Sequence, residues 1–348
     1  MAEVVFAIPG DVDTPTGGYR YDRRVIDELR ALRWDVKPLR LPGDFPAPSD
    51  ASLKETERLF AAVPADALLL VDGLAFGVLP ALLLDRVPRK FLALVHHPLG
   101  LETGITRERA DLLLKTERAA LARARRVIVT SKPTAALLFR DFGVAKEKIT
   151  VAEPGTETAP RAKGSGGAPR LLSVGAVNAR KGYDTLVAAL AKIVDLPWES
   201  RIAGTLDRDL PAAAAVKAAI KSGGLDARIK LLGTLDDAAL AAEYDQATLF
   251  VLPSHFEGFG MAFTEAMARG LPVVAGDAGA APTTVPGDAG VLVPPGNTDA
   301  LAAVLRRLLT DAAELKRRSD AAWKHAQHFP RWRDTAKAVA SALVEASR

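Results

Sequence analysis

Two carboxylates lie eight residues apart in a glycine-rich segment of the second half of the chain. Glu257 belongs to the run Glu-Gly-Phe-Gly, which follows an apolar stretch ending at Leu252, and Glu265 lies in a predicted helix just beyond it. Both carboxylates are expected near the carboxyl end of one strand, where they can accept hydrogen bonds from several hydroxyls. Gly258 and Gly260 leave backbone N–H groups open to a polyol. The segment predicts a site for a sugar-like ligand with a ribose nearby.

Two adjacent cations, Arg180 and Lys181, open another predicted helix. Positive charges at a helix amino end oppose its dipole unless an anion neutralises them. A diphosphate would do so, since arginine binds phosphate with two hydrogen bonds and lysine as a point charge. A solvated helix start explains the pair about as well. Gly17 and Gly18 precede the first predicted helix and let N–H groups approach an anion, although such a pair is more often only a turn.

Several common chemistries lack their sequence signals. The chain has no cysteine, which excludes disulfides, thiolate nucleophiles and cysteine metal sites. The dinucleotide fingerprint Gly-x-Gly-x-x-Gly does not occur between a strand and a helix, and no P-loop is present. Two Asp-x-Asp runs, at 11–13 and 207–209, are read as chance loop spacings. Of the neighbours His96 and His97, one is expected to be structural because adjacent residues of an extended segment point to opposite sides. We expect no metal.

The elements that must position these residues alternate between short apolar runs and amphipathic runs, which is typical of βαβ units around parallel sheets. The chain has 348 residues, of which 49% are hydrophobic and 25% charged, and this length favours two domains. Predicted strands are 4–8, 67–71, 91–95, 127–130 and 149–151, then 170–174, 199–202, 229–232, 249–252, 272–275 and 290–293. Predicted helices are 20–32, 52–62, 106–125 and 133–142, followed by helices from residues 184, 212, 236, 262 and 299, and a last helix 331–346.

The domain boundary is expected where Gly, Pro and Ser dominate and the apolar periodicity is lost. We predict a first α/β domain over 1–158, a flexible linker over 159–169 and a second α/β domain over 170–330. The remaining residues, 331–348, are expected to form a helix that packs back on the first domain. Doubly wound domains bind ligands at the carboxyl ends of their strands, so a cleft between the two domains is the expected site.

Composition also bounds the partners and the location. The net charge is +4, and because basic and acidic residues are balanced between the two halves, nucleic acid is not an expected partner. Segment 86–126 is an exception, with 10 basic and 4 acidic residues. We read it as a surface helix and keep peripheral contact with an anionic membrane as an alternative. No export signal and no membrane span are expected, which favours a cytoplasmic protein.

With these residues in view, the chain resembles retaining glycosyltransferases of family 4, which have the GT-B fold of two Rossmann-like domains facing each other across a cleft. The signature is Glu-x7-Glu, here Glu257-Gly-Phe-Gly followed by Glu265-Ala-Met-Ala-Arg-Gly-Leu-Pro-Val-Val. The resemblance runs from about residue 170 to 310 and includes Arg180-Lys-Gly, Ile202-Ala-Gly, Leu232-Gly-Thr-Leu and Leu252-Pro-Ser. The first half is compatible through Gly17-Gly18, His97 and Thr130-Ser131.

The resemblance implies a role for each matched residue. Arg180 and Lys181 would hold the donor diphosphate, Glu265 the ribose hydroxyls, and Glu257 the donor sugar together with the backbone of Gly258, Phe259, Gly260 and Met261. Gly17 and Gly18 would approach the phosphates, and His97 would face the sugar near the reacting carbon. The reaction would be metal-independent and need no cofactor, with a nucleotide-diphosphate sugar as donor, UDP-sugar before GDP-sugar. The acceptor would be a hydroxyl of a lipid, a polysaccharide precursor or a small metabolite.

The sequence departs from the family pattern at 278–284, where relatives often have Gly-Gly-x-x-Glu and this chain has Ala-Gly-Ala-Ala-Pro-Thr-Thr. Contacts are therefore not transferred to this loop. Two alternatives to transfer stay open: a nucleotide-sugar epimerase or phosphorylase on the same fold, and a non-catalytic nucleotide-sugar-binding protein. Epimerisation would change the donor sugar with no acceptor present. The joint presence of Arg180, Lys181, Glu257, Glu265 and His97 argues against a degraded site.

Overall fold

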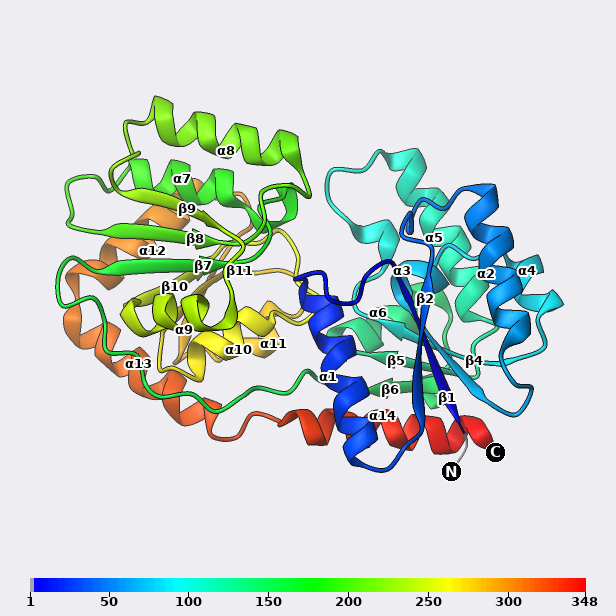
Figure 1. The fold of residues 1–348 in the computed structure, drawn as a ribbon. Coiled ribbons are helices and arrows are strands. Elements are labelled where there is room, and N and C mark those ends of the chain that lie inside the picture. Colours follow the sequence, from blue (N-terminus) through cyan, green and yellow to red (C-terminus); the bar gives the residue numbers. More distant parts are fainter. Residues whose placement is uncertain (1–2) are drawn as a thin grey trace. The chain divides into compact units, whose positions relative to one another are not determined.

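The computed structural model describes residues 3–348, which divide into two compact units (Figure 1). Unit 1 comprises the residues up to Gly155 together with Pro330–Arg348, and unit 2 is Thr156–Phe329. Each unit has a parallel six-stranded sheet with flanking helices. The fold is therefore the predicted one of two Rossmann-like α/β domains. Within the described residues, no helix has the length and apolar character needed to cross a membrane.

The sheet of unit 1 has the strand order β2-β1-β3-β4-β5-β6, with every neighbouring pair parallel. Its strands are β1 (Val4–Pro9), β2 (Val36–Leu41), β3 (Leu68–Asp72), β4 (Lys90–Val95), β5 (Arg126–Val129) and β6 (Ile149–Val151). Its helices are α1 (Gly17–Ala31), α2 (Asp50–Ala62), α3 (Gly73–Phe76), α4 (Ala81–Arg86), α5 (Arg107–Leu121), α6 (Lys132–Phe142) and α14 (Trp332–Ser347). The central strands β1 and β3 are buried along their whole length, as expected where helices cover both faces.

The sheet of unit 2 has the order β12-β11-β10-β7-β8-β9, again all parallel. Its strands are β7 (Arg170–Val174), β8 (Glu199–Ala203), β9 (Ile229–Gly233), β10 (Leu249–Leu252), β11 (Val273–Gly276) and β12 (Gly290–Val293). Its helices are α7 (Tyr183–Ala191), α8 (Leu210–Ser222), α9 (Asp237–Gln246), α10 (Met261–Met267), α11 (Ala281–Thr284), α12 (Thr298–Thr310) and α13 (Ala312–Ala326). A short 3₁₀ turn, Ala179–Lys181, precedes α7.

Both sheets have a switch point, where the chain returns to the centre and builds outward in the other direction. In unit 1 it lies between β1 and β3, and in unit 2 between β7 and β10. Ligands of open α/β sheets bind outside the carboxyl ends of the strands at such points. The carboxyl edges at these two places are therefore where functional side chains are expected.

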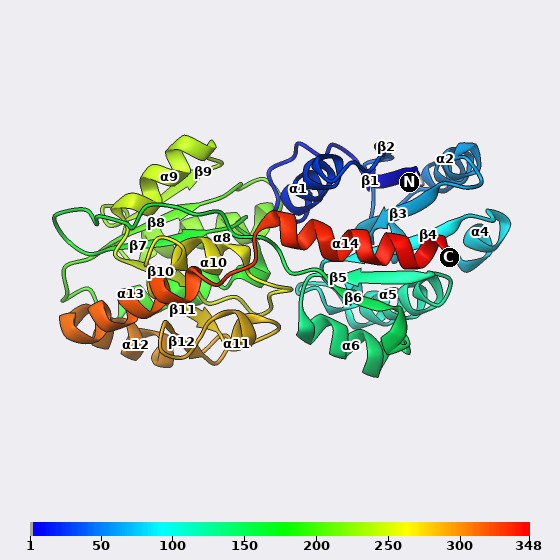
Figure 2. The same cartoon turned by 90° about the horizontal axis from the view of Figure 1, so that it is seen from below.

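The C-terminal helix α14 belongs to unit 1, beside α1 and the sheet (Figure 2). The Thr335 hydroxyl donates a 2.7 Å hydrogen bond to the carbonyl of Glu153, just after β6. The Tyr21 and Trp332 rings meet edge-on, 5.7 Å apart. Gly155 is required at the crossing because a Cβ there would lie 2.2 Å from the Trp332 nitrogen.

The segment predicted as a flexible linker, 159–169, lies inside unit 2. The amide of Ala162 donates to the carbonyl of Arg269, and the amides of Lys163 and Gly164 both donate to the carbonyl of Asp245, each at 2.9 Å. These backbone bonds fix the segment to unit 2 although its composition is that of a linker. The chain passes between the units earlier, after Gly155, and returns after Phe329.

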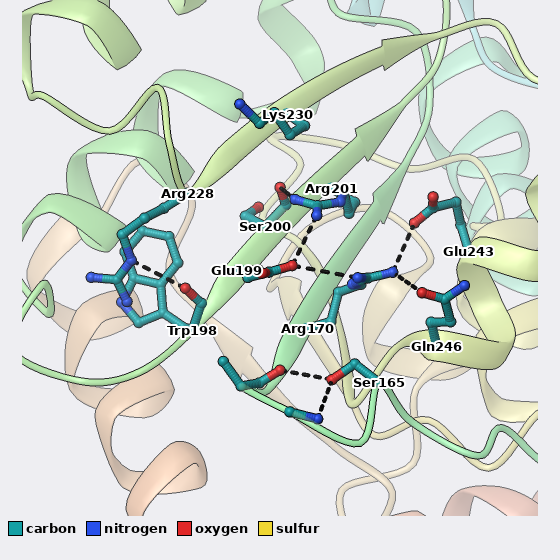
Figure 3. A network of polar contacts seen from close by, with 12 residues as sticks. Ser165, Arg170, Trp198, Glu199, Ser200, Arg201, Arg228, Lys230, Glu243 and Gln246 are labelled. Carbon is teal, nitrogen blue, oxygen red and sulfur yellow. Dashed lines mark hydrogen bonds and ion pairs between the residues drawn. The ribbon is translucent and has the colours of Figure 1, made fainter.

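The amino edge of the unit 2 sheet carries a network of paired charges (Figure 3). Arg170, at the start of β7, lies 3.4 Å from Glu199 and 3.8 Å from Glu243, and it donates to Gln246. Arg201 donates a 2.8 Å hydrogen bond to the same Glu199 carboxylate. Each charge of this network has an opposite partner within the unit. We therefore assign the network a structural role.

Most predicted elements are present, with boundaries shifted by a few residues. The prediction missed the edge strand β2, whose sequence contains Pro38 and whose central residues are largely exposed. Proline lowers the strand signal and is tolerated at a sheet edge. It also missed α3, α4, α11 and a separate α13, of which the first three have only four to six residues. Elements this short carry too few turns for an apolar period to be recognised.

Candidate functional site

The predicted phosphate-binding cations and the first carboxylate meet at the carboxyl edge of the unit 2 sheet. Arg180 and Lys181 lie in the 3₁₀ turn after β7, and Glu257 lies in the loop after the neighbouring strand β10. Lys181 Nζ is 2.7 Å from Glu257 Oε1, and Arg180 Nη1 is 3.5 Å from Glu257 Oε2. Lys181 and Glu257 are 76 positions apart in the sequence, and the switch point between β7 and β10 brings them together.

The Glu257 carboxylate is buried, with 6% of the residue exposed. Burial would raise its pKa, but the charges of Lys181 and Arg180, with hydrogen bonds from Lys181 and Ser254, lower it to about 2. Glu257 is therefore an anion at neutral pH. The group of three carries two positive charges and one negative charge, which leaves a surplus positive charge at the switch point.

The loops that carry these side chains are held by close backbone contacts. The carbonyl of Arg180 accepts a 2.8 Å hydrogen bond from the amide of His255, and Arg180 Nη1 donates at 2.8 Å to the carbonyl of Phe256. Gly182 has φ +67°, and a Cβ there would lie 2.3 Å from the carbonyl oxygen of Pro253. Only glycine fits this position, so it couples the loop after β7 to the loop after β10.

A buried tyrosine lies beside the charged group. The Tyr183 hydroxyl donates a 2.9 Å hydrogen bond to the carbonyl of Gly175, at the end of β7. Burial and the Glu257 charge raise the pKa of Tyr183, so it stays neutral and acts as a donor. Tyr183 could not be identified from the sequence, since one tyrosine at a helix start forms no pattern. Its position two residues after Lys181, a predicted site residue, is the feature of the sequence that could have drawn attention to it.

The second carboxylate, Glu265, lies on α10 and is half-buried. The Tyr244 hydroxyl donates to Glu265 Oε2 at 3.2 Å, and Arg269 lies over the Tyr244 ring at 4.4 Å from its centroid. Gly260, just before α10, has φ +92°, and a Cβ there would lie 2.3 Å from the Phe263 ring. The half-exposed turn of Gly258, Phe259, Gly260 and Met261 lies between the two carboxylates in the sequence.

The loop that departs from the family pattern is held to this turn. The amide of Ala280 donates at 2.8 Å to the carbonyl of Glu257, and the Thr284 hydroxyl donates at 2.8 Å to the carbonyl of Phe259. Gly279 has φ +61°, and a Cβ there would lie 2.2 Å from the Glu257 oxygen. The loop thus supports the backbone of the Glu257 segment, a role that its sequence does not indicate.

In unit 1, the predicted glycine pair begins α1. The Thr16 hydroxyl caps the helix by accepting from the amide of Tyr19 at 3.1 Å, and Gly17 is exposed. His97 follows β4 and is half-buried, as is its neighbour His96. His96 is the structural member of the pair, because its ring lies 3.0 Å from Asp22. The role of His97 at a sugar stays a prediction.

The Asp-x-Asp runs have structural uses. Asp209 caps α8 by accepting from the amide of Ala212 at 3.0 Å, and its other oxygen accepts from Ala179 at 3.2 Å. Asp11 accepts from the amide of Asp13 at 2.9 Å, closing a local turn. In both runs, the carboxylate at one end is engaged by backbone amides.

The arginines of segment 86–126 are largely used within unit 1. Arg86 pairs with Glu57 and Arg123 with Asp85, both at 2.7 Å. Arg109 and Arg118 donate to the carbonyls of Pro46 and Asp141, and Arg89 to those of Ala61 and Val63. These bonds explain much of the positive charge through contacts inside the chain, and contact with an anionic membrane stays a prediction.

Known proteins match this chain over nearly its whole length. One family model, Glycosyltransferase Family 4, matches residues 4–159, and a second, Glycosyl transferases group 1, matches residues 168–311. Among solved structures, a sucrose-phosphate synthase of Thermosynechococcus elongatus is 25% identical with a TM-score of 0.83, covering 97% of this chain and 98% of that one. Anabaena HepE in complex with UDP and glucose has 18% identity and a TM-score of 0.79, covering 99% and 100%.

The two units and the charged switch point of unit 2 thus define a GT-B glycosyltransferase. The chain belongs to family 4 of these enzymes. A similar curated protein is the MMP α-(1→4)-mannosyltransferase of Mycolicibacterium hassiacum, 28% identical over 84% of this chain and 74% of that protein. The D-inositol 3-phosphate glycosyltransferase of Streptomyces bingchenggensis is 30% identical over 72% of this chain, and the match spans 59% of that relative's length.

Proposed function

We propose that this protein transfers a hexosyl group from a nucleotide-diphosphate sugar to a hydroxyl acceptor with retention of the anomeric configuration and without a metal ion. The observation that carries the proposal is the surplus positive charge of Arg180, Lys181 and Glu257 at the switch point of unit 2. The donor is a UDP-sugar, with a GDP-sugar as second choice. Support comes from Anabaena HepE, whose structures contain UDP, UDP and glucose, and UDP-glucose.

In this proposal, Arg180 and Lys181 bind the donor diphosphate, assisted by N–H groups of Gly17 and Gly18. Glu265 accepts hydrogen bonds from the ribose hydroxyls. Glu257 and the backbone of Gly258 to Met261 bind the donor sugar, and His97 faces the reacting carbon. A divalent ion is not needed because the two cations neutralise the diphosphate.

The proposed reaction takes place on one face of the sugar. The bond between the anomeric carbon and the diphosphate oxygen breaks, and a bond from that carbon to the acceptor oxygen forms on the same side. The acceptor proton passes to the departing diphosphate, which leaves as the nucleoside diphosphate. Negative charge develops on the leaving oxygen, so fixed cations beside it supply the largest part of the rate enhancement.

Calorimetric titration with UDP, GDP and ADP in the presence of EDTA tests the donor site directly. We expect one nucleotide to bind without metal and Glu265→Ala to weaken it about tenfold, as is typical for loss of a charge-assisted hydrogen bond. Asp299→Ala, which removes an exposed carboxylate of the same unit, is the matched control and should bind as the wild type does. Failure of all three nucleotides to bind the wild type would remove the donor-site proposal.

Two further assays separate transfer from its alternatives. Incubation with the donor alone, followed by NMR of the sugar, distinguishes an epimerase, which changes the sugar without an acceptor. NMR of the anomeric proton of the product shows whether the configuration of the donor is kept. An inverted product would contradict the retaining mechanism while leaving glycosyl transfer intact.

A further inference from the structure

A second group of charged side chains lies at the switch point of unit 1, and the proposed reaction does not use it. His96 Nε2 is 3.0 Å from Asp22 Oδ1 on α1 and 3.3 Å from Asp72 Oδ2 at the end of β3. Asp22 is fully buried and Asp72 is 1% exposed, whereas the His96 side chain keeps 22% of its surface exposed. We call these three residues the His96 cluster.

The cluster lies beside the glycine pair that begins α1. A Cβ built on Gly18 would lie 3.5 Å from Cδ2 of His96, so a larger side chain at this position would pack against the imidazole. Tyr21, on the same buried face of α1, meets the His96 ring edge-on at 5.1 Å and donates a 2.8 Å hydrogen bond to the carbonyl of Ala152. The first two turns of α1 are thus anchored to the carboxyl ends of β3, β4 and β6.

The cluster is built so that its imidazole stays charged. Burial lowers the pKa of His96, but the two carboxylates more than offset this and raise it to about 10. Burial, with the neighbouring charge of Asp72, raises the pKa of Asp22 to about 7 against the opposing effect of His96. The imidazole of His96 is therefore charged at neutral pH, and burial favours the protonated form of Asp22.

Stability alone gives a weak reason for such an arrangement. Burying ionised groups costs free energy, and apolar residues of similar size usually pack a helix against a sheet at least as well. Asp22 also lies on the apolar face of α1, among Tyr21, Val25 and Ile26. The ion pairs add a defined geometry: the pair of His96 with Asp72 fixes the imidazole at the ends of β3 and β4, and the pair of His96 with Asp22 holds α1 to that imidazole.

We propose that Asp22, Asp72 and His96 are positioning residues, which fix the Gly17–Gly18 turn against the sheet so that its N–H groups keep the orientation that diphosphate binding requires. This inference rests on the proposed function, which assigns the donor phosphates to that turn. His96 lies beside Gly18, and the two aspartates act through His96. Asp22→Asn keeps the shape of the side chain and removes its charge, so it tests the cluster with little change in packing.

The first experiment measures the turn itself and does not depend on any ligand. Hydrogen exchange of the amides of Tyr19 and Arg20, which both donate to Thr16, should become about tenfold faster in Asp22→Asn when read by NMR on the full chain, since local opening of α1 becomes easier. Thr56→Val, which removes a buried hydroxyl on α2 in the same unit, is the matched control and should leave these amides as in the wild type. Unchanged exchange in Asp22→Asn would overturn the proposal.

The second experiment connects the cluster to phosphate binding. Calorimetry should show UDP bound about tenfold more weakly by Asp22→Asn, and UMP bound within about twofold of the wild type. The same loss should appear in His96→Gln, and the double variant should show no further loss, because the aspartate acts through the histidine. Equal losses for UDP and UMP, or additive losses in the double variant, would contradict a positioning role.

Two other outcomes are decisive. If the wild type binds none of UDP, GDP and ADP, the proposed function fails, and the amide-exchange result still decides whether the cluster fixes the turn.

The three side chains also offer ligand atoms within 4.8 Å of one another, a set able to hold a metal ion. Zinc binding to the wild type that Asp22→Asn abolishes would therefore identify a metal site and overturn the proposal.

Discussion

The switch points of the two sheets carry groups of opposite charge balance. In unit 1, one base, His96, is held by two acids, and burial with the second acid raises the pKa of Asp22 to about 7. In unit 2, one acid, Glu257, is held by two bases, which lower its pKa to about 2. The equivalent positions of the two sheets thus differ: in unit 1 the ion pairs hold helix α1, and in unit 2 the group keeps a surplus positive charge.

The difference shows what each edge is suited to do. A surplus of positive charge attracts a diphosphate, whereas a group whose acids outnumber its base cannot bind an anion through those acids. We therefore assign the binding charge to unit 2 and a positioning role to the cluster in unit 1. Variants that remove one charge at a time test this division.

The largest expected effect is that of removing the surplus charge. Lys181→Ala should lower the rate of nucleoside diphosphate release from the donor by roughly a hundredfold to a thousandfold, the usual result of losing one group that stabilises a leaving oxyanion. Release from UDP-glucose and GDP-mannose is measured at saturating donor. Arg180→Ala should act in the same direction.

The matched control for Lys181→Ala is Lys192→Ala, at the other end of the same helix segment, where the lysine pairs with Asp299 on the surface. Its release rate should equal that of the wild type. A Lys181→Ala enzyme that releases the diphosphate at the wild-type rate would refute the role of this lysine at the leaving group.

The second expected effect is on stability and has a definite pH dependence. The pKa of Glu257 falls from 4.5 in the unfolded chain to about 2 in the fold, so its ion pairs stabilise unit 2 above pH 4.5 and are lost as the pH falls toward 2. Glu257→Gln should therefore cost about 3 kcal/mol of unfolding free energy at pH 7. Denaturant titrations at pH 7, 4 and 3 should show the difference from the wild type shrinking with each step.

A constant difference at all three pH values would show that Glu257→Gln acts through packing and not through charge. Glu243→Gln provides a comparison at the other edge of the sheet, where the carboxylate lies 3.8 Å from Arg170. Only the Glu257 variant should also change nucleotide binding.

The sequence predicted the unit 2 site more fully than the unit 1 cluster. Arg180, Lys181, Glu257 and Glu265 stand in short local motifs that follow predicted strands. Because parallel strands have their carboxyl ends at one edge of a sheet, the location of these residues at that edge could be anticipated. The ion pair between Lys181 and Glu257 could not, since side-chain pairing across 76 residues depends on loop conformation. Gly182 and Gly279, which set those loops by close backbone contact, are recognisable only from φ and distance.

The cluster of unit 1 is harder to predict from the sequence, because its signal is a single polar residue at an apolar position of a helix. Asp22 falls where the helical period of α1 requires an apolar side chain, and that mismatch was the available clue. Asp72 ends a strand and also caps α3, so its sequence context explains it without His96. The role of His97 was assigned from the family resemblance. The structure shows that the adjacent His96 pairs with the two aspartates.

The amino edge of the unit 2 sheet provides a second comparison with the carboxyl edge. Its charges are paired and lie far from the carboxyl ends of the strands. Arg170→Ala should lower the unfolding free energy by ~2 kcal/mol, because it removes a largely buried guanidinium that lies beside Glu199 and Glu243, while Arg201 still pairs with Glu199. The affinity for the nucleotide should stay at the wild-type value. Chemical denaturation and calorimetry on the same protein preparation measure both quantities.

A loss of nucleotide affinity in Arg170→Ala with unchanged stability would reverse the assignment of the two edges. Arg170→Lys keeps the charge but not the planar fork that reaches Glu199, Glu243 and Gln246 together. It should recover part of the lost stability.

The smallest expected effect is that of an exposed pair. Lys192 and Asp299 form a surface ion pair with half or more of each side chain exposed, and such pairs contribute little because solvent screens them. Lys192→Ala should leave the melting temperature unchanged within error, in low salt and at 0.5 M NaCl alike. A salt-dependent loss of stability in this variant would mean that exposed charges of unit 2 contribute to its stability. Stability measurements would then no longer distinguish the amino edge, with Arg170, from the carboxyl edge, with Lys181, and only nucleotide binding would separate the two.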